Sequence, residues 1–375
     1  MDPRSVRAVF MRGGTSKALI FHAGDLPGDR SGWDSIFLSA MGTPDPFGRQ
    51  LNGMGGGLSS LSKVAVIGPS THPDADLDYT FAQVSIKEAR VEYRGNCGNI
   101  SSAVGPFAID ENLLSVPDGA ATVRIHNTNT KRIIHATFAV ENGRAAVAGN
   151  TSIPGVAGTG APIRLDFLEP GGAMTGKLLP TGQVTDIFDI DGVGPVEISI
   201  VDAGNACVFI SAASLGLNAT ESPDTLEGTP GLLKTLRRIG EHALVRLGFA
   251  ENLEAASNQS VPLIGIVGPA ADSVTLAGEA VPADAANLCL RMISSGQPHR
   301  ASPLTGALCT AVAAAMSGTI PNRFASRSSD ALRLATPSGV LEVSADVSRI
   351  DAGWNVSRAS FFRTARRLFE GRVYI

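Results

Sequence analysis

The sequence predicts an α+β protein of two similar halves, each a curved, mainly antiparallel sheet or barrel around one central buried helix. Two observations predict this fold class. Three short segments of the first half recur in the same order in the second half. Each half also holds one helical stretch that is small or apolar on nearly every side, with short strand patterns around it. A helix of that kind must be covered on all sides.

The repeat rests on three matched pairs of segments. Residues 97–104 match 305–312, residues 14–20 match 204–210, and residues 63–69 match 263–269. Each match is weak, but their common order along the chain indicates two homologous halves. The Gly- and Pro-rich stretch 149–182 is the expected connection. We therefore predict a first domain over 1–185 and a second over 186–368.

Each expected element follows from a local pattern. The two buried helices are expected at about 98–112 and 306–317, because nearly all their side chains are small or apolar. An amphipathic helix should begin with Thr229 as N-cap and Pro230 at its first position. Short apolar runs predict strands at 6–11, 17–21, 89–93, 123–126, 132–140, 163–167, 196–201 and 261–267, and a hairpin over 332–347 turning at 337–339.

Composition restricts the class of protein. The chain has 375 residues, of which 43% are hydrophobic and 18% charged, and no apolar run approaches the roughly 18 residues of a membrane span. The net charge is −4 and the basic residues are scattered, so nucleic acid is not an expected partner. Four cysteines without paired spacing, and a start without a long apolar segment, favour the reducing cytoplasm.

Motifs for metals and nucleotide cofactors are absent from the sequence. No dinucleotide-binding loop, Walker loop or HExxH motif occurs, and the six histidines lack metal-ligand spacing. Asp186, Asp189 and Asp191 are interpreted as a strand that ends in an Asp-Gly turn, not as a calcium loop. We therefore expect no metal and no cofactor. Clustered glycines among the 42 in the chain indicate tight turns or backbone N–H groups that approach an anion.

Two reactive side chains occur in the first half only. Cys97 lies at an expected helix N-terminus, where the helix dipole lowers a thiol pKa that is about 8.5 in free cysteine. Lys63 enters an apolar strand after a glycine loop, where desolvation lowers a pKa of about 10.4. Their aligned partners in the second half are Thr305 and Leu263. An inert buried thiol and a surface lysine are the alternative interpretations.

The chain resembles the PrpF-like isomerases, a family that includes 2-methylaconitate isomerase and 4-oxalomesaconate tautomerase. The resemblance covers the whole chain and lies in segments 11–17, 53–63, 78–84, 95–99, 104–108 and 363–366. It implies the diaminopimelate-epimerase-like fold, with residues 369–375 returning as a strand to the first domain. It also implies that Lys63 and Cys97 are the acid/base pair. Racemases of this fold use two cysteines, so Thr305 in place of the second thiol disfavours amino-acid epimerisation.

The resemblance implies a cofactor-independent allylic isomerase (tautomerase) of a small unsaturated di- or tricarboxylate. The run from Asp78 to Val84 favours 4-oxalomesaconate as substrate. The alternatives are 2-methylaconitate, aconitate or methylitaconate, and, in another class, a non-catalytic metabolite-binding or accessory protein. No membrane is an expected partner, and assembly into a homo-oligomer stays open.

Further residues are expected to bind the substrate. Arg12, His299 and Arg300 are candidate carboxylate clamps, although a structural salt bridge is the alternative for each arginine. Backbone N–H groups at Gly98 and Gly306 suit an enolate-like charge. The other expected contacts are Gly13, Thr15, Ser16, Ser60, Asn96, Asn99 and Thr305.

Overall fold

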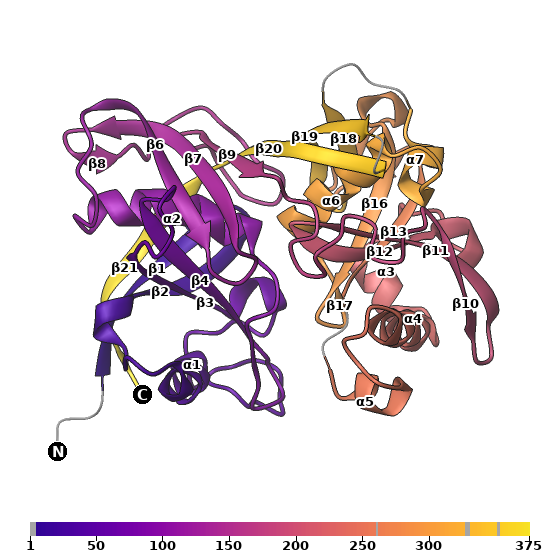
Figure 1. Cartoon of the computed structure of the whole chain (residues 1–375), viewed down its shortest axis with the longest axis horizontal. Coiled ribbons are helices and arrows are strands. Elements are labelled where there is room, and N and C mark those ends of the chain that lie inside the picture. Colours follow the sequence, from indigo (N-terminus) through magenta and orange to yellow (C-terminus); the bar gives the residue numbers. More distant parts are fainter. Residues whose placement is uncertain (1–4, 260–261, 327–330, 351–352) are drawn as a thin grey trace. The chain divides into compact units, whose positions relative to one another are not determined.

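The computed structural model describes residues 5–259, 262–326, 331–350 and 353–375 (Figure 1). Contacts divide the chain into one unit of Met1–Leu168 with Phe362–Ile375 and a second of Glu169–Phe361. The first unit is therefore built from both ends of the chain. The boundary between the units, at residues 168–169, lies before the predicted boundary at residue 185. The reason is that the Gly-rich stretch forms hydrogen bonds with the second unit. Gly172 N donates to Asp202 O, and Thr175 N donates to the Asp202 carboxylate.

Over its described residues, the first unit contains two α-helices and the strands around them. Its elements are β1 (Ser5–Gly13), β2 (Ser16–His22), α1 (Trp33–Met41), β3 (Lys63–Pro69), β4 (Leu77–Val84), β5 (Val91–Glu92), α2 (Gly98–Asp110), β6 (Gly119–Asn127), β7 (Arg132–Glu141), β8 (Arg144–Ala145), β9 (Ile163–Leu168) and β21 (Ala365–Tyr374). Short 3-10 turns occur at Ala23–Asp25, Arg30–Gly32 and Ser59–Leu61.

The second unit has more helices on its outside. Its elements are β10 (Asp186–Ile190), β11 (Gly194–Ala203), β12 (Asn205–Ser211), α3 (Pro223–Gly228), α4 (Leu232–Arg246), α5 (Leu253–Ser257), β13 (Leu263–Pro269), β14 (Ser273–Val274), β15 (Ala280–Val281), β16 (Leu288–Ser294), β17 (Gln297–Pro298), α6 (Leu304–Ala315), α7 (Ile320–Phe324), β18 (Leu332–Thr336) and β19 (Gly339–Ile350). Strand β20 (Gly353–Arg363) carries the chain back toward the first unit.

The two units repeat the same order of strand pairs. In the first, β21 pairs with β1 and the order continues through β2, β3, β4, β6, β7 and β9. In the second, the matching order is β10, β11, β12, β13, β16, β18, β19 and β20. The third and fifth pairs of each series are parallel and the others antiparallel. This repetition, with a buried helix in each unit, confirms the predicted fold class.

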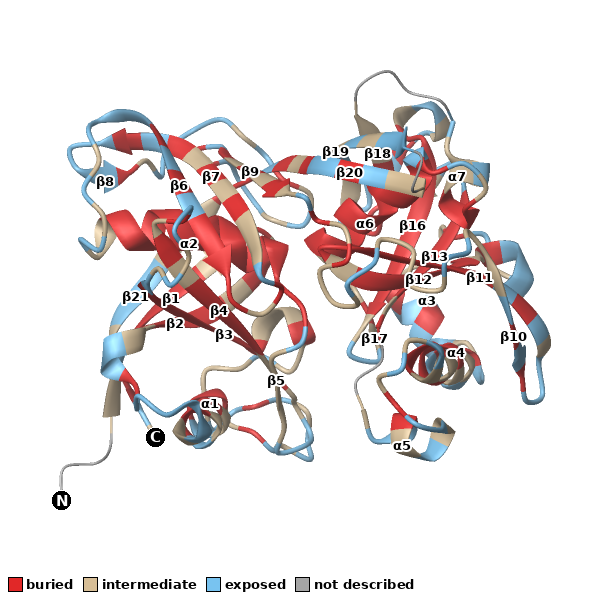
Figure 2. Ribbon diagram, in the orientation of Figure 1, coloured by how far each residue is buried: buried red, intermediate tan, exposed pale blue. Residues whose placement is uncertain are grey.

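Helix α2 forms the centre of the first unit. Every residue from Gly98 to Ile109 is buried (Figure 2), and the helix contacts β1, β2, β6, β7, β9 and β21. Small residues on all its sides allow this close packing. Helix α6 is buried in the same way from Leu304 to Ala314. The outer face of each sheet is covered by an amphipathic helix, α1 in the first unit and α4 in the second.

Local predictions differ from the structure in a few places. The strand expected at 89–93 is only Val91–Glu92. Helix α4 has Gly231 as its N-cap in the left-handed conformation, whereas Thr229 ends α3, so the predicted cap was wrong. The Asp-Gly turn after β10 is confirmed, with Gly192 at positive φ. Residue 261, the predicted start of one strand, lies outside the described residues.

Candidate active site

Lys63 faces α2 because of the alternation along β3. Val64 and Val66, on the opposite face, pack in the cluster with α1. The Lys63 side chain is buried, and its Nζ donates to Gln83 Oε1 at 2.5 Å, directly opposite on β4. The same Nζ lies 5.0 Å from the centroid of the Phe81 ring. A buried strand thus presents an amine to the start of α2.

Gln83 fixes the polar environment of this amine. Its Nε2 donates to Ser59 O at 3.0 Å and to Ser62 O at 2.8 Å, so its Oε1 is turned toward Lys63. Burial lowers the pKa of Lys63, because the charged ammonium loses water. A hydrogen bond and charge interaction with Cys97 oppose this and raise the pKa, but burial is the larger effect. The thiol therefore lies close enough to the amine to affect its pKa.

Cys97 is the N-cap of α2 and is 9% exposed. Its carbonyl oxygen accepts from Ser101 N at 2.9 Å and from Ser101 Oγ at 3.1 Å, which fixes the first turn of the helix. Asn96, beside it, is buried and its Oδ1 accepts from Asn127 Nδ2 at 3.4 Å. The thiol therefore lies at the positive end of the α2 dipole.

A second group of predicted residues surrounds Asn99, the second residue of α2. Its Oδ1 accepts from Thr15 N at 3.3 Å and from Arg363 Nε at 3.2 Å, and its Nδ2 donates to Thr15 Oγ1 at 3.1 Å. A Cβ on Gly14, which has φ +50°, would lie 2.1 Å from Asn99 Oδ1. A Cβ on Gly13 would lie 2.5 Å from Asn99 O. These glycines let the β1–β2 hairpin approach the helix.

Arg12 fixes the same hairpin to the chain after β20. Its guanidinium donates to Gly14 O at 3.0 Å, to Thr364 O at 2.8 Å and to Thr364 Oγ1 at 3.0 Å. These contacts are structural, so a role as carboxylate clamp stays a prediction. Arg363 is buried, and this burial lowers its pKa to about 9. It lies beside Asn99, and the sequence predicts no role for it.

The remaining predicted residues of the first unit lie at its edges. Ser16 is buried opposite Gly13 in the β1–β2 hairpin, and Gly98 is the buried first residue of α2. Ser60 is half-buried in the turn before β3. The structure therefore brings together Lys63 and Cys97, with the Asn99 group following on the same helix.

The predicted residues of the second unit make contacts of their own. Arg300 is exposed and pairs with Asp224 at 3.0 Å, as the salt-bridge alternative expects. His299 Nδ1 accepts from Ala301 N at 3.1 Å. Thr305 Oγ1 accepts from Asn205 Nδ2 at 2.9 Å. Gly306 is buried at the start of α6. Their role in binding substrate stays a prediction.

The structure corrects the alignment of the two buried helices. Helix α2 has Cys97 as its N-cap and α6 has Pro303, so Pro303, and not Thr305, corresponds to Cys97. Thr305 instead corresponds to Asn99, because each is the second helical residue and bonds to the neighbouring hairpin. Sequence alignment slipped by two residues because both first turns are made of small residues. The second unit still has no thiol at this cap.

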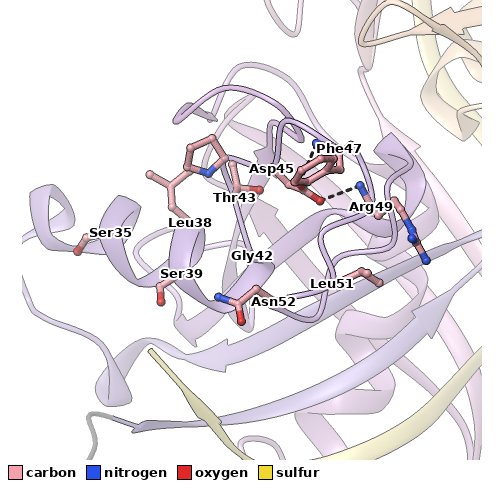
Figure 3. Close-up of a pocket in the computed structure, with 11 residues that line it drawn as sticks. Ser35, Leu38, Ser39, Gly42, Thr43, Asp45, Phe47, Arg49, Leu51 and Asn52 are labelled. Carbon is pink, nitrogen blue, oxygen red and sulfur yellow. Dashed lines mark hydrogen bonds between the residues drawn. The ribbon is translucent and has the colours of Figure 1, made fainter.

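A pocket of about 880 Å³ lies elsewhere in the first unit (Figure 3). It is formed by the end of α1 and the loop that follows, with Phe47 and Leu51 strongly exposed at its rim. Lys63 and Cys97 do not line it. Within the described ranges, no group of side chains suits a metal ion, and no helix has the length and apolar character that crossing a bilayer requires.

The family model "PrpF protein" matches residues 4–375. The chain belongs to the PrpF family. This confirms the resemblance seen in the sequence. A relative named 3-methylitaconate isomerase, from Eubacterium barkeri, is 42% identical over 100% of this chain and 98% of its own length. A 2-methyl-aconitate isomerase from Cupriavidus necator is 36% identical, over 99% of this chain and 97% of its own. A (4E)-oxalomesaconate Delta-isomerase from Novosphingobium sp. is 34% identical, over 99% and 98%.

Solved structures agree with the PrpF fold. The crystal structure of a methylitaconate-delta-isomerase has a TM-score of 0.79 and 40% identity, covering 100% of this chain and 96% of that one. A hydroxyproline epimerase from Agrobacterium vitis has a TM-score of 0.57 at 10% identity, covering 99% of this chain and 93% of that one. This second similarity concerns the fold alone.

Proposed function

We propose that this PrpF-family protein is a cofactor-independent isomerase that moves a carbon–carbon double bond by one position in a small unsaturated di- or tricarboxylate. The observation that carries the proposal is that the buried Lys63 amine and the Cys97 thiol, at the positive end of α2, lie close enough for the thiol to raise the pKa of the amine. An amine and a thiol in contact supply one base and one acid. The isomerase names of the relatives support this reaction class.

Lys63 is the proposed base and Cys97 the proposed acid. Burial lowers the pKa of Lys63, so the neutral amine forms at lower pH than in free lysine. The amine takes the allylic proton, and the electrons of that C–H bond form the new double bond. The electrons of the old double bond take the proton of the Cys97 thiol at the far carbon. Proton transfer from the Lys63 ammonium to the Cys97 thiolate restores the starting state.

The start of α2 stabilises the intermediate. Removal of the allylic proton spreads negative charge into an adjacent carboxylate or keto group. The N-terminus of a helix carries about half a positive charge and unsatisfied N–H groups, which stabilise such an oxyanion. Cys97 and Gly98 lie at this end of α2. The enolate-like charge is therefore expected beside the thiol that quenches it.

Methylitaconate is the proposed substrate. The identity to the relative named for it is 42%, against 34% for the relative named for oxalomesaconate. These identities do not support 4-oxalomesaconate, the substrate favoured by the sequence. Both 4-oxalomesaconate and 2-methylaconitate stay predictions. Itaconates carry a terminal methylene next to a saturated carbon. A one-position shift converts that methylene to a methyl group.

Proton NMR in D₂O tests the reaction with methylitaconate, 2-methylaconitate and 4-oxalomesaconate in parallel. With methylitaconate, the vinylic methylene signals should disappear and a methyl signal carrying one deuterium should grow, because thiol and amine protons exchange with solvent between turnovers. Conversion of another substrate at a higher kcat/KM would correct the substrate assignment. No conversion of any of the three would contradict the proposed function.

A further inference from the structure

Tyr79 is a buried polar residue that the mechanism above does not use. It lies in the middle of β4, and its side chain is fully buried. Buried tyrosine hydroxyls normally have a hydrogen-bond partner. The Tyr79 hydroxyl has none of normal geometry among the described residues. The polar groups that act on it are the Cys97 thiol and the Ser101 hydroxyl, at the start of α2.

The alternation of β4 places Tyr79 on the side of the Lys63–Cys97 pair. Tyr79, Phe81 and Gln83 lie on one face of the strand. Gln83 accepts from Lys63, and the Phe81 ring lies next to the same amine. The Ser101 hydroxyl already donates to Cys97 O. The Tyr79 hydroxyl, on the same face of β4, lies close enough to the thiol for the charge of Cys97 to affect its pKa.

The repeat of the fold gives an independent reason to connect Tyr79 with the pair. In the first unit Ile67 pairs with Tyr79, and in the second the equivalent pair is Val267 with Leu290. Leu290 is also fully buried, so an aliphatic side chain fills this position in the same fold. At the three equivalent positions, the second unit has Leu263, Pro303 and Leu290 in place of the amine, the thiol and the phenol. The hydroxyl is therefore not required by the architecture.

We propose that Tyr79 is a positioning residue whose hydroxyl donates a hydrogen bond to the Cys97 thiolate that forms when Cys97 gives its proton to the substrate. The inference rests on the proposed role of Cys97. No proton leaves Tyr79 in this step. A thiolate is a much stronger acceptor than a thiol, so the bond strengthens as the charge develops.

The charge balance around the thiol agrees with a donor role. Burial raises the pKa of Tyr79 well above its ordinary value, so the phenol stays protonated and can only donate to an anion. Lys63, from β3, is a second titratable group that interacts with Cys97. After proton transfer, the thiolate would lie between an ammonium and a phenol. Both stabilise it.

The test is the titration of Cys97 in Tyr79→Phe, which removes one oxygen and keeps the ring. Cysteine labelled with ¹³C at Cβ reports thiol ionisation by NMR, and Cys97→Ser assigns the signal. Loss of a hydrogen bond to a charged group should move the Cys97 midpoint upward by about one pH unit and reduce kcat by about tenfold, with little change in KM. Tyr93→Phe is the matched control, because the Tyr93 hydroxyl donates to Asp34 at 2.6 Å.

The Cys97 midpoint decides between the outcomes. An upward shift in Tyr79→Phe but not in Tyr93→Phe supports the inference, even if the wild-type protein converts none of the three substrates and the proposed function fails. An unchanged midpoint overturns it, whether or not kcat falls. Equal shifts in both variants overturn it as well, since they would report general loosening of the unit.

Discussion

The start of α2 and the start of α6 occupy the same place in two copies of one fold. The cap is Cys97 in the first and Pro303 in the second. The first residue of the neighbouring parallel strand is Lys63 in one unit and Leu263 in the other. Burying an amine costs free energy that an aliphatic side chain does not. The fold therefore forms without these polar groups, and their presence in one unit indicates chemistry there.

The hairpins next to these helices differ as well. In the first unit, a Cβ on Gly14 would lie 2.1 Å from Asn99. In the second, a Cβ on the equivalent Gly204 would have its nearest neighbour at 3.7 Å. Of these two hairpins, the one in the unit with Lys63 and Cys97 therefore approaches its buried helix more closely. The comparison separates residues that maintain the fold from residues that maintain the site.

Replacing Lys63 by the leucine of the other unit should have the largest effect. Lys63→Leu removes the proposed base, so kcat should fall at least roughly 100-fold while the protein stays folded. Circular dichroism and the NMR assay measure the two properties. Lys87→Met, which changes an exposed lysine of the same unit, should keep wild-type activity. Near wild-type turnover in Lys63→Leu would exclude Lys63 as the base.

Cys97→Ser should reduce turnover by a comparable factor of at least roughly 100, because a hydroxyl is a far weaker acid than a thiol. The base survives in this variant, so deuterium should still enter the substrate slowly in D₂O, whereas Lys63→Leu should show no exchange. The opposite pattern would make Cys97 the base.

Cys309→Ala is the matched control for the thiol, since Cys309 is buried in α6 and contacts Val201 O at 3.2 Å. Its activity should be unchanged. A large loss of kcat without a loss of thermal stability would place chemistry in the second unit and break the comparison.

The pH dependence of kcat/KM should be bell-shaped. Activity should fall on the acidic side as Lys63 becomes protonated, and burial moves this limb below the range of free lysine. Activity should fall on the basic side as the donor loses its proton. Rates measured across pH on the best substrate test this. An acidic limb that persists unchanged in the residual activity of Lys63→Leu would assign it to another group.

Alanine substitutions at the two hairpin glycines should have the smallest effect on activity. They compare equivalent positions of the two units directly. Gly14 and Gly204 both have positive φ, so alanine at either should cost about 1–2 kcal/mol of backbone strain. Gly14→Ala must in addition displace Asn99, so it should lose more stability and also some activity. Gly204→Ala should keep its kcat. Chemical denaturation and the NMR assay measure both. Equal losses of stability and activity would show that the close approach is unimportant.

Periodicity and repeats were enough to predict the buried helices, most strands and the repeated fold. The alignment of the two helix starts, and the pairing of residues between neighbouring strands, were harder to predict. Both helix starts consist of small residues, so a slip of two residues paired Cys97 with Thr305 and hid Pro303 as its counterpart. Local patterns also cannot show which strands are neighbours. Gln83 is the partner of Lys63 only through the β3–β4 register.

Two further residues near the candidate site, Tyr79 and Arg363, could not be assigned a role from the sequence around them. Tyr79 lies in a largely buried strand, where an aromatic residue usually serves packing. Arg363 reaches Asn99 only because the chain returns to the first unit after the second is complete. No spacing between two residues 264 positions apart indicates such a bond. The segment 363–366 resembles the family, which pointed to Arg363 without indicating what the residue does.

The pairing of β21 with β1 determines when the sheet of the first unit can finish folding during synthesis. In the second unit the matching strand, β10, directly precedes β11 and emerges from the ribosome together with its sheet. In the first unit, one edge of β1 stays unpaired until β21 has been synthesised. At a synthesis rate of roughly 5–20 residues per second, this takes tens of seconds. An interrupted chain would expose that edge, a template for aggregation, and would lack Arg363 and Thr364 beside the hairpin. The sheet of the first unit is therefore complete only after the chain has been synthesised through β21.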